Sequence, residues 1–245
     1  MKLKRFASKT HQGPYLELNE DEMEVDINDN LFFVLDGFGG SGVGDKVAAL
    51  VKQNLKLSYT KMGHDPDATM PFFYSHKYLL EANALINAFH ATHQKVKQRN
   101  TAFQMQDKGG ASALAVSFSE NHLNLVSVGN CKAILYRKGQ LAPIVIPDSL
   151  CSFSSDSYQG LHQTCPMSGF GLFDDLQVMV KELKIVEDDQ VILMTDGVYA
   201  RLQDDDIKYI LDKTELAYHK KIDELFKLVN ERGNMDNQTT VLLHF

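Results

Sequence analysis

The stretch Leu31-Phe32-Phe33-Val34-Leu35-Asp36-Gly37-Phe38-Gly39-Gly40 places an apolar run directly before a carboxylate and a cluster of glycines. Five consecutive apolar residues are short enough to be a strand buried on both faces. The residues that follow predict that this strand stops at Asp36, because neither helices nor strands tolerate such a cluster well. A second apolar run, Val191-Ile192-Leu193-Met194-Thr195-Asp196-Gly197, ends in the same way. Both runs therefore hold a carboxylate at the end of a rigid strand, where it can reach solvent.

The rest of the chain alternates between helical periodicity and short apolar segments typical of strands. Apolar residues recur every three to four positions in segments that predict helices over about residues 45–59, 73–98, 205–211 and 222–229. Other patterns predict strands over residues 111–118, 123–128, 133–136, 141–146, 177–185, 191–194 and 239–245. The strands between 111 and 146 are expected to form an antiparallel meander, and a serine-rich stretch from 147 to 171 a long surface loop. This order favours an α+β fold over a doubly wound parallel sheet.

The composition limits the classes of protein that the chain can represent. Of its 245 residues 44% are hydrophobic, and 32 Asp and Glu against 25 Lys and Arg give a formal net charge of −7. One domain over residues 1–245 suits this length, and the acidic balance argues against a nucleic-acid binder and a polybasic membrane anchor. No apolar run approaches the ~18–20 residues of a membrane span. No apolar segment follows the basic residues 1–5, so we expect a cytoplasmic protein with reduced cysteines.

Acidic residues lie at four edges of predicted strands. Asp36 and Asp196 each precede a glycine, Asp236 precedes the last strand, and Glu20-Asp21 precedes the first apolar run. Taken singly, an Asp-Gly pair is more often a hairpin turn, and Asp236 more often begins an Asx turn. Most acidic residues between 17 and 29 are expected to lie on a solvated loop or edge strand. Taken together, the four positions favour hard divalent cations, which carboxylates, carbonyls and water coordinate.

Six motifs follow one another along the chain. They are Asn19-Glu20-Asp21, Asp36-Gly37-Phe38-Gly39-Gly40, Gly109-Gly110-Ala111-Ser112-Ala113, Val128-Gly129-Asn130-Cys131-Lys132-Ala133, Thr195-Asp196-Gly197 and Met235-Asp236-Asn237. In this order the sequence resembles the metal-dependent protein phosphatases (the PPM, or type 2C, family) in their compact bacterial form. The resemblance covers nearly the whole chain, from about residue 10 to the C-terminus.

The resemblance implies a fold and a metal centre. The fold would be an antiparallel two-sheet β-sandwich flanked by helices on both sides, with two Mn²⁺ or Mg²⁺ ions in a cleft at one end. Asp36 would bridge both ions, Gly37 would offer its backbone carbonyl with Glu20 on the same ion, and Asp196 and Asp236 would hold the other. Asp36, Asp196 and Asp236 would thus be the catalytic set.

The resemblance also implies supporting residues and a reaction. Asp21 and Asn237 would support the ligands without touching an ion, and residues 148–171 would form a flap beside the cleft. The reaction would be hydrolysis of phosphoserine or phosphothreonine by a water that bridges the two ions. A phosphorylated protein substrate, and a serine/threonine kinase as counterpart, are the partners that this implies.

Three positions depart from the family pattern. The family usually has an arginine four residues before the motif glutamate to hold the substrate phosphate, and Leu16 occupies that place here; a basic residue among positions 2–5 could substitute. Phe38 stands where many eukaryotic members have a histidine proposed as general acid, so water would protonate the leaving serine. Asn130 stands where an aspartate helps to bind a third metal, and its neutral oxygen predicts a weakened third site.

These departures leave a second interpretation open, a catalytically impaired relative that binds a phosphoprotein or a partner and regulates without turnover. Other chemistry is less well supported. Cys131 and Arg137 have the spacing of a cysteine-dependent phosphatase, but the strand predicted between them would hold them about 20 Å apart, at ~3.3 Å per residue. His90 and His93 are expected to be solvated helix residues, and residues 39–44 lack the Lys-Ser/Thr end of a nucleotide-binding loop.

Overall fold

The computed structural model describes residues 2–40, 42–63, 69–149 and 164–245. The strands are β1 (Arg5–His11), β2 (Asp21–Asp26), β3 (Leu31–Gly39), β4 (Gly109–Ser119), β5 (His122–Val128), β6 (Lys132–Arg137), β7 (Gln140–Val145), β8 (Met179–Lys184), β9 (Gln190–Met194) and β10 (Gln238–His244). The helices are α1 (Gly44–Gly63), α2 (Leu80–Thr101), the 3₁₀ turn η1 (Met105–Asp107), α3 (Asp196–Tyr199), α4 (Asp204–Leu211) and α5 (Tyr218–Glu231).

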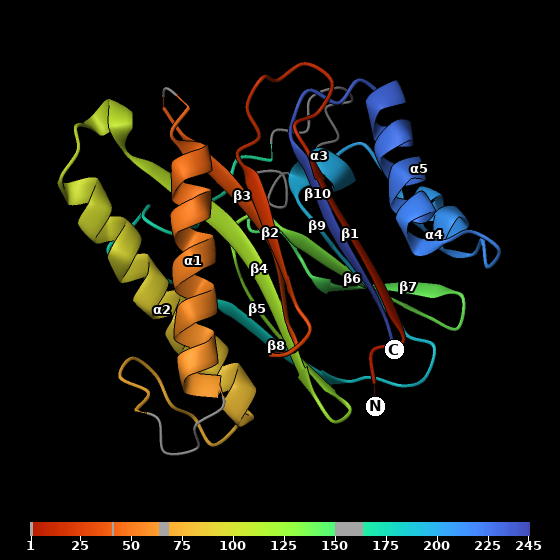
Figure 1. Ribbon diagram of the computed structural model, residues 1–245, viewed down its shortest axis with the longest axis horizontal. Helices are drawn as coiled ribbons and strands as arrows, with labels where there is room; N and C mark the ends of the chain where they lie inside the picture. The colour runs from red at the N-terminus through yellow and green to blue at the C-terminus, as the bar shows by residue number, and fades with distance from the viewer. Residues whose placement is uncertain (1, 41, 64–68, 150–163) are drawn as a thin grey trace.

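The strands form two antiparallel sheets that pack face to face. Sheet A has the order β1-β10-β9-β6-β7, and sheet B has the order β2-β3-β4-β5-β8. Helices α1 and α2 lie across the outer side of sheet B, while α3, α4 and α5 lie beside sheet A (Figure 1). The predicted α+β sandwich with helices on both sides is therefore confirmed.

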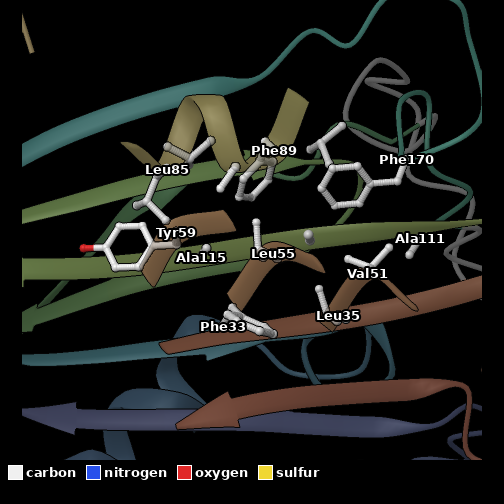
Figure 2. Packing of buried hydrophobic residues seen from close by; sticks show 14 of the residues in the cluster. Phe33, Leu35, Val51, Leu55, Tyr59, Leu85, Phe89, Ala111, Ala115 and Phe170 are labelled. Carbon is white, nitrogen blue, oxygen red and sulfur yellow. The ribbon is translucent and has the colours of Figure 1, made fainter. Parts of the chain in front are cut away.

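The apolar run of β3 is buried on both faces, as predicted. Phe32 and Val34 belong to the cluster between the two sheets, together with Leu193 and Leu243 of sheet A. The alternate residues of the run point the other way, because successive side chains of a strand face opposite sides. Figure 2 shows Phe33 and Leu35 on this second side, against Val51 and Leu55 of α1 and the phenylalanine pair Phe89 and Phe170. A single strand thus joins the two cores.

The prediction that this strand stops at Asp36 is wrong. Strand β3 continues to Gly39, and Asp36, Gly37 and Phe38 pair with residues 112, 111 and 110 of β4. The partner segment is Gly109-Gly110-Ala111-Ser112, and its small side chains leave room for the glycines of β3 to stay in the ladder. Asp36 is therefore fixed by strand pairing on both sides, since β2 pairs with it as well.

The predicted meander between residues 111 and 146 is wrong in its middle. β4 pairs with β5 and β6 pairs with β7, but β5 belongs to sheet B and β6 to sheet A. The chain crosses between the sheets at Gly129, whose φ of +85° favours glycine. A Cβ at Gly129 would also lie 2.2 Å from Ser112 Oγ. This crossing places the next residue, Asn130, between the sheets.

The predicted helix over residues 73–98 begins later, at Leu80, and runs to Thr101. Two asparagines of α2 explain the late start. The Asn87 Oδ1 accepts the backbone N–H groups of Phe72 and Phe73, and the Asn83 Nδ2 donates to the Ser75 carbonyl. These side chains hold the preceding segment in a non-helical path.

Several smaller expectations can be compared with the structure. β2 occupies part of the acidic stretch as an edge strand, as expected, whereas strand β1 and the short helix α3 were not predicted. Arg137 lies on strand β6, as expected in the argument against a cysteine-dependent phosphatase. Its guanidinium binds Asp189 through Nε and Nη2, at 2.8 and 2.6 Å.

His93 is not solvated, contrary to the prediction. It is 1% exposed and its Nδ1 accepts the N–H of Gly171. Burial lowers the pKa of both His93 and His90.

Most of the expected surface loop and flap, residues 150–163, lies outside the described residues. None of the helices that the structure describes is long and apolar enough to cross a bilayer. The cytoplasmic location and the single domain over residues 1–245 stay predictions.

Candidate metal centre

Acidic residues from both sheets meet at one end of the sandwich, the end that carries α3 in Figure 1. In sheet B, Asp21 is the first residue of β2 and pairs directly with Asp36. In sheet A, Asp196 follows β9 as the first residue of α3, and Asp236 lies two residues before β10. The Thr195 hydroxyl donates to Asp21 Oδ2 at 2.8 Å, so this contact joins the two sheets at the acidic end.

Glycines allow the backbone segments that carry these residues to touch. A Cβ on Gly37 would lie 2.6 Å from the Glu20 carbonyl, and a Cβ on Gly197 would lie 1.7 Å from the Asn237 carbonyl. Neither position accepts a side chain without displacing its neighbour. Gly37 lies inside strand β3 and Gly197 inside helix α3, so the hairpin-turn interpretation of both Asp-Gly pairs is wrong.

The carbonyl of Gly37 lies on the same side as the Glu20 carboxylate. A Cβ placed on Gly44 would be 2.7 Å from the Gly37 oxygen and 2.7 Å from Glu20 Cδ, so these two oxygen-bearing groups face one small space. Glu20 Oε1 accepts the Gly44 N–H at 2.9 Å, and burial raises the pKa of the Glu20 carboxyl. Sequence analysis predicted this pair of groups on one ion.

Asn237 organises the segment that carries Glu20. Its Oδ1 accepts the Glu20 N–H at 2.8 Å, and its Nδ2 donates to the carbonyls of Gln12 and Leu18, each at 2.9 Å. Asn237 is buried, and its amide is occupied by backbone groups on every side. The side chain therefore positions Glu20 and Asp21 from the other sheet.

Negative charge is concentrated at the acidic end. Asp21 is 4% exposed and Asp196 is 7% exposed. Burial raises the pKa of Asp21 and Asp36 well above the ordinary range, and the neighbouring carboxylates raise both further. Burial, together with the charge of Asp236, raises the pKa of Asp196 to about 6. In the part of the chain that the structure describes, no Lys, Arg or His forms an ion pair with these residues or with Glu20.

Asn130 has a contact that its sequence position did not reveal. The side chain is 1% exposed, and its Nδ2 donates to Asp196 Oδ2 and to the Thr164 carbonyl, each at 2.9 Å. The Thr164 hydroxyl also donates to Asp196 Oδ2. Asn130 Oδ1 is buried and has no hydrogen-bond partner among the described residues. An aspartate here could not donate to Asp196, so the amide changes how that carboxylate is held.

The donor set fits a hard divalent cation by its chemistry. It consists of carboxylates and a backbone carbonyl, which Mn²⁺ and Mg²⁺ accept, and burial and the neighbouring carboxylates raise the pKa of both Asp36 and Asp196. Still, no three or more His, Cys, Asp or Glu side chains among the described residues are arranged to hold an ion by themselves. The carboxylates converge without forming a closed cage, and one oxygen of Asp196 is taken by Asn130 and Thr164.

The candidate phosphate-binding residues are distributed differently from the sequence expectation. Leu16 is 40% exposed and offers no donor. Lys4 forms ion pairs with Glu187 and Asp188. Arg5 is the strand partner of the last residue of β10, so both residues lie at the end of β1 that is far from the acidic residues. The structure therefore does not support a substitute among positions 2–5. Instead Arg201 lines a pocket of about 130 Å³ together with Asp196 and Asp236.

Comparisons with known proteins give a consistent result. The family model described as Protein phosphatase 2C matches residues 1–146. No curated protein sequence matches the chain.

Solved structures show the same fold at low sequence identity. The chain is similar to "PppA, a key regulatory component of T6SS in Pseudomonas aeruginosa", with a TM-score of 0.80, 21% identity, and 98% of this chain and 97% of that chain covered. It is similar to the serine/threonine phosphatase PstP/Ppp of Mycobacterium tuberculosis, with a TM-score of 0.82, 20% identity and 98% of each chain covered. A third structure is the catalytic domain of PstP in complex with two manganese ions, with a TM-score of 0.79, 20% identity, and 98% and 97% covered.

Proposed function

Because the chain belongs to the protein phosphatase 2C family, whose model matches more than half of it, we propose that it hydrolyses phosphoserine and phosphothreonine in proteins. The observation that carries the proposal is the group of carboxylates that both sheets contribute to one end of the sandwich, of which Asp21 and Asp196 are buried and none forms an ion pair with a described side chain. Such a set costs stability unless cations bind there. The similar PstP catalytic domain was crystallised with two manganese ions, which supports the same cofactor here.

In this proposal the metal ligands are the residues predicted from the sequence: Glu20, Asp36, Gly37, Asp196 and Asp236. Two bound Mn²⁺ or Mg²⁺ ions would lower the pKa of water and stabilise negative charge on the transferring phosphoryl group. Asp36 is suited to serve both ions, because it pairs with Asp21 on β2 and its carboxyl lies close enough to Asp196 of the other sheet for their charges to interact.

The remaining residues of the centre hold these groups in place. Asp21 accepts a hydrogen bond from the Thr195 hydroxyl, and Asn237 accepts one from the backbone N–H of Glu20. In this proposal both residues position the ligands without binding an ion. Phe38 presents no proton donor beside Asp36. We therefore propose that solvent protonates the leaving serine or threonine oxygen, as the sequence suggested. The substrate would be a phosphorylated protein, with a serine/threonine kinase as the opposing enzyme.

A second candidate function is regulation by binding without turnover. Two observations favour it: Leu16 supplies no phosphate donor, and Asp196 already accepts hydrogen bonds from Asn130 and Thr164. The similar PppA is described as a regulatory component, which is a statement about that protein.

Hydrolysis of an aryl phosphate in the presence of Mn²⁺ distinguishes the two functions. We expect turnover that a chelator abolishes and that Asp36→Asn and Asp236→Asn reduce by at least about 100-fold, since a metal ligand supports several kcal/mol of transition-state stabilisation. Asp223→Asn is the matched control, because Asp223 lies on α5, forms an ion pair with Lys9 and takes no part in the candidate metal centre. Turnover that survives the chelator would contradict the metal mechanism, and Mn²⁺ binding without turnover on any phosphopeptide would support the regulator.

A further inference from the structure

A phosphatase of this kind needs a positively charged group that holds the substrate's phosphoryl oxygens, in addition to its metal ions. A phosphoryl dianion binds best to a planar guanidinium that donates two parallel hydrogen bonds. On the wall formed by residues 12–20, Leu16 offers no such donor. Lys4 and Arg5 lie at the far end of β1, which spans about 20 Å at ~3.3 Å per residue.

Arg201 lies on the sheet A side of the acidic end, in the connection between α3 and α4. It lines the pocket of about 130 Å³ into which Asp196 and Asp236 also face. This volume equals that of roughly four water molecules at ~30 Å³ each, a size that accommodates a phosphoryl group. The pocket therefore combines two expected metal ligands with one arginine.

The guanidinium of Arg201 is not used elsewhere in the part of the chain that the structure describes. None of its side-chain nitrogens forms a hydrogen bond or ion pair with another described residue, although Asp196 and Asp236 line the same pocket. A neighbouring cation, by contrast, is engaged within the protein. Lys132 lies 3.7 Å from Asp204 and over the ring of Tyr199. An arginine left unpaired beside two carboxylates is available for an external anion.

The backbone of Arg201 is held firmly even though its side chain is available. Arg232 Nη1 donates to the Arg201 carbonyl at 2.8 Å. The same guanidinium binds both oxygens of Asp206, at 2.6 and 2.8 Å. Asp206 in turn accepts the Gln203 N–H at the start of α4. This chain of contacts fixes the point from which the Arg201 side chain extends.

We propose that Arg201 binds the phosphoryl group of the substrate from the α3–α4 side, in place of an arginine on the wall that carries Leu16. The proposal rests on the proposed phosphatase function, and it assigns Arg232 as a positioning residue. Two divalent cations bound by the carboxylates would offset the negative charge of Glu20, Asp36, Asp196 and Asp236, so that the positive charge of Arg201 can attract a dianion. The ligand class is a phosphomonoester dianion, with inorganic phosphate as the product.

The test measures binding of inorganic phosphate to the Mn²⁺-loaded protein by isothermal titration calorimetry. We expect Arg201→Ala to weaken phosphate binding about tenfold or more, as for loss of hydrogen bonds to a charged group, and Arg201→Lys to restore part of it. Lys227→Ala removes an equal charge from α5, outside this pocket, and should leave phosphate binding unchanged.

A second titration, with Mn²⁺ alone, separates phosphate recognition from a structural role. Removing a cation from beside Asp196 and Asp236 should leave Mn²⁺ affinity equal or increase it, whereas damage to the site would weaken Mn²⁺ and phosphate together. A phosphate affinity within twofold of wild type in Arg201→Ala, a parallel loss of Mn²⁺ affinity, or no phosphate binding by the wild type overturns the proposal. Phosphate binding through Arg201 without hydrolysis of any phosphoester would instead contradict the proposed function and leave this inference standing.

Discussion

Substituting Asp196 by asparagine should make the metal-free protein more stable at neutral pH, although it removes a proposed ligand. The Asp196 pKa is raised from an ordinary 3.8 to about 6, mainly by burial and then by the charge of Asp236. Because the folded state raises this pKa, the group costs no stability below about pH 4, and the cost grows until the pH exceeds about 6. The difference between the two pKa values corresponds to about 3 kcal/mol at pH 7. For a protein of this size, Asp196→Asn should therefore raise the melting temperature by about 6–12 °C in the presence of a chelator.

Urea unfolding with a chelator at pH 4 and pH 7.5 measures this effect as the difference between variant and wild type. The control is Asp206→Asn, since the hydrogen bond and charge of Arg232 lower the pKa of Asp206. That substitution should destabilise the protein at pH 7.5, the opposite sign from Asp196→Asn, and it should still do so at pH 4, because the contribution of a lowered carboxyl pKa is lost only as the pH falls below the ordinary value of 3.8. With Mn²⁺ at about 1,000 times its Kd the order should reverse for Asp196, because binding then adds about 4.1 kcal/mol to the wild type, more than the about 3 kcal/mol that the substitution adds to the metal-free protein. If Asp196→Asn destabilises the metal-free protein at pH 7.5 as Asp206→Asn does, the buried-charge account of this site is refuted.

Two further substitutions test the departures from the family pattern. Leu16→Arg should raise kcat/KM on an aryl phosphate by about tenfold, since it adds a guanidinium at a position that is 40% exposed and tolerates a longer side chain; an unchanged kcat/KM would mean that this wall does not meet the phosphate. Asn130→Asp should increase activity at low Mn²⁺ but lower the melting temperature in chelator, because it exchanges a donor to Asp196 for a second carboxylate. Equal Mn²⁺ dependence and equal melting temperatures in the variant and the wild type would contradict both effects.

Local patterns in the sequence predicted much of the fold, because burial leaves a periodic record along the chain. The run of β3, the helices α1, α4 and α5 and the closing strand β10 all lie where periodicity placed them, within a few residues. The errors occurred where distant residues decide the outcome. β3 continues past Asp36 because β4 supplies glycines and small side chains opposite it. The start of α2 is set by the side chains of Asn83 and Asn87, and no periodicity encodes such contacts.

The candidate site was predictable as a set of residue types but not as a network. Carboxylates at strand edges, in family order, identified Asp36, Asp196 and Asp236 as residues that would meet. The donors around them, Asn130 to Asp196 and Thr195 to Asp21, connect the two sheets and have no local signature. Arg201 was missed for the same reason, because an arginine after a short helix is an ordinary surface residue until the pocket beside it is known.

The position of the acidic residues gives the metal ions a structural consequence as well as a chemical one. Glu20, Asp21 and Asp36 belong to the sheet B side, whereas Asp196 and Asp236 belong to the sheet A side. Without cations the two groups of carboxylates repel each other across the sandwich, and among the described residues a neutral donor, the Thr195 hydroxyl, joins them there. Cations bound by both groups would attract the carboxylates of both sheets and so replace the repulsion between them. The charge that makes Asp196 costly in the metal-free protein is thus the charge that lets metal binding hold the two sheets together.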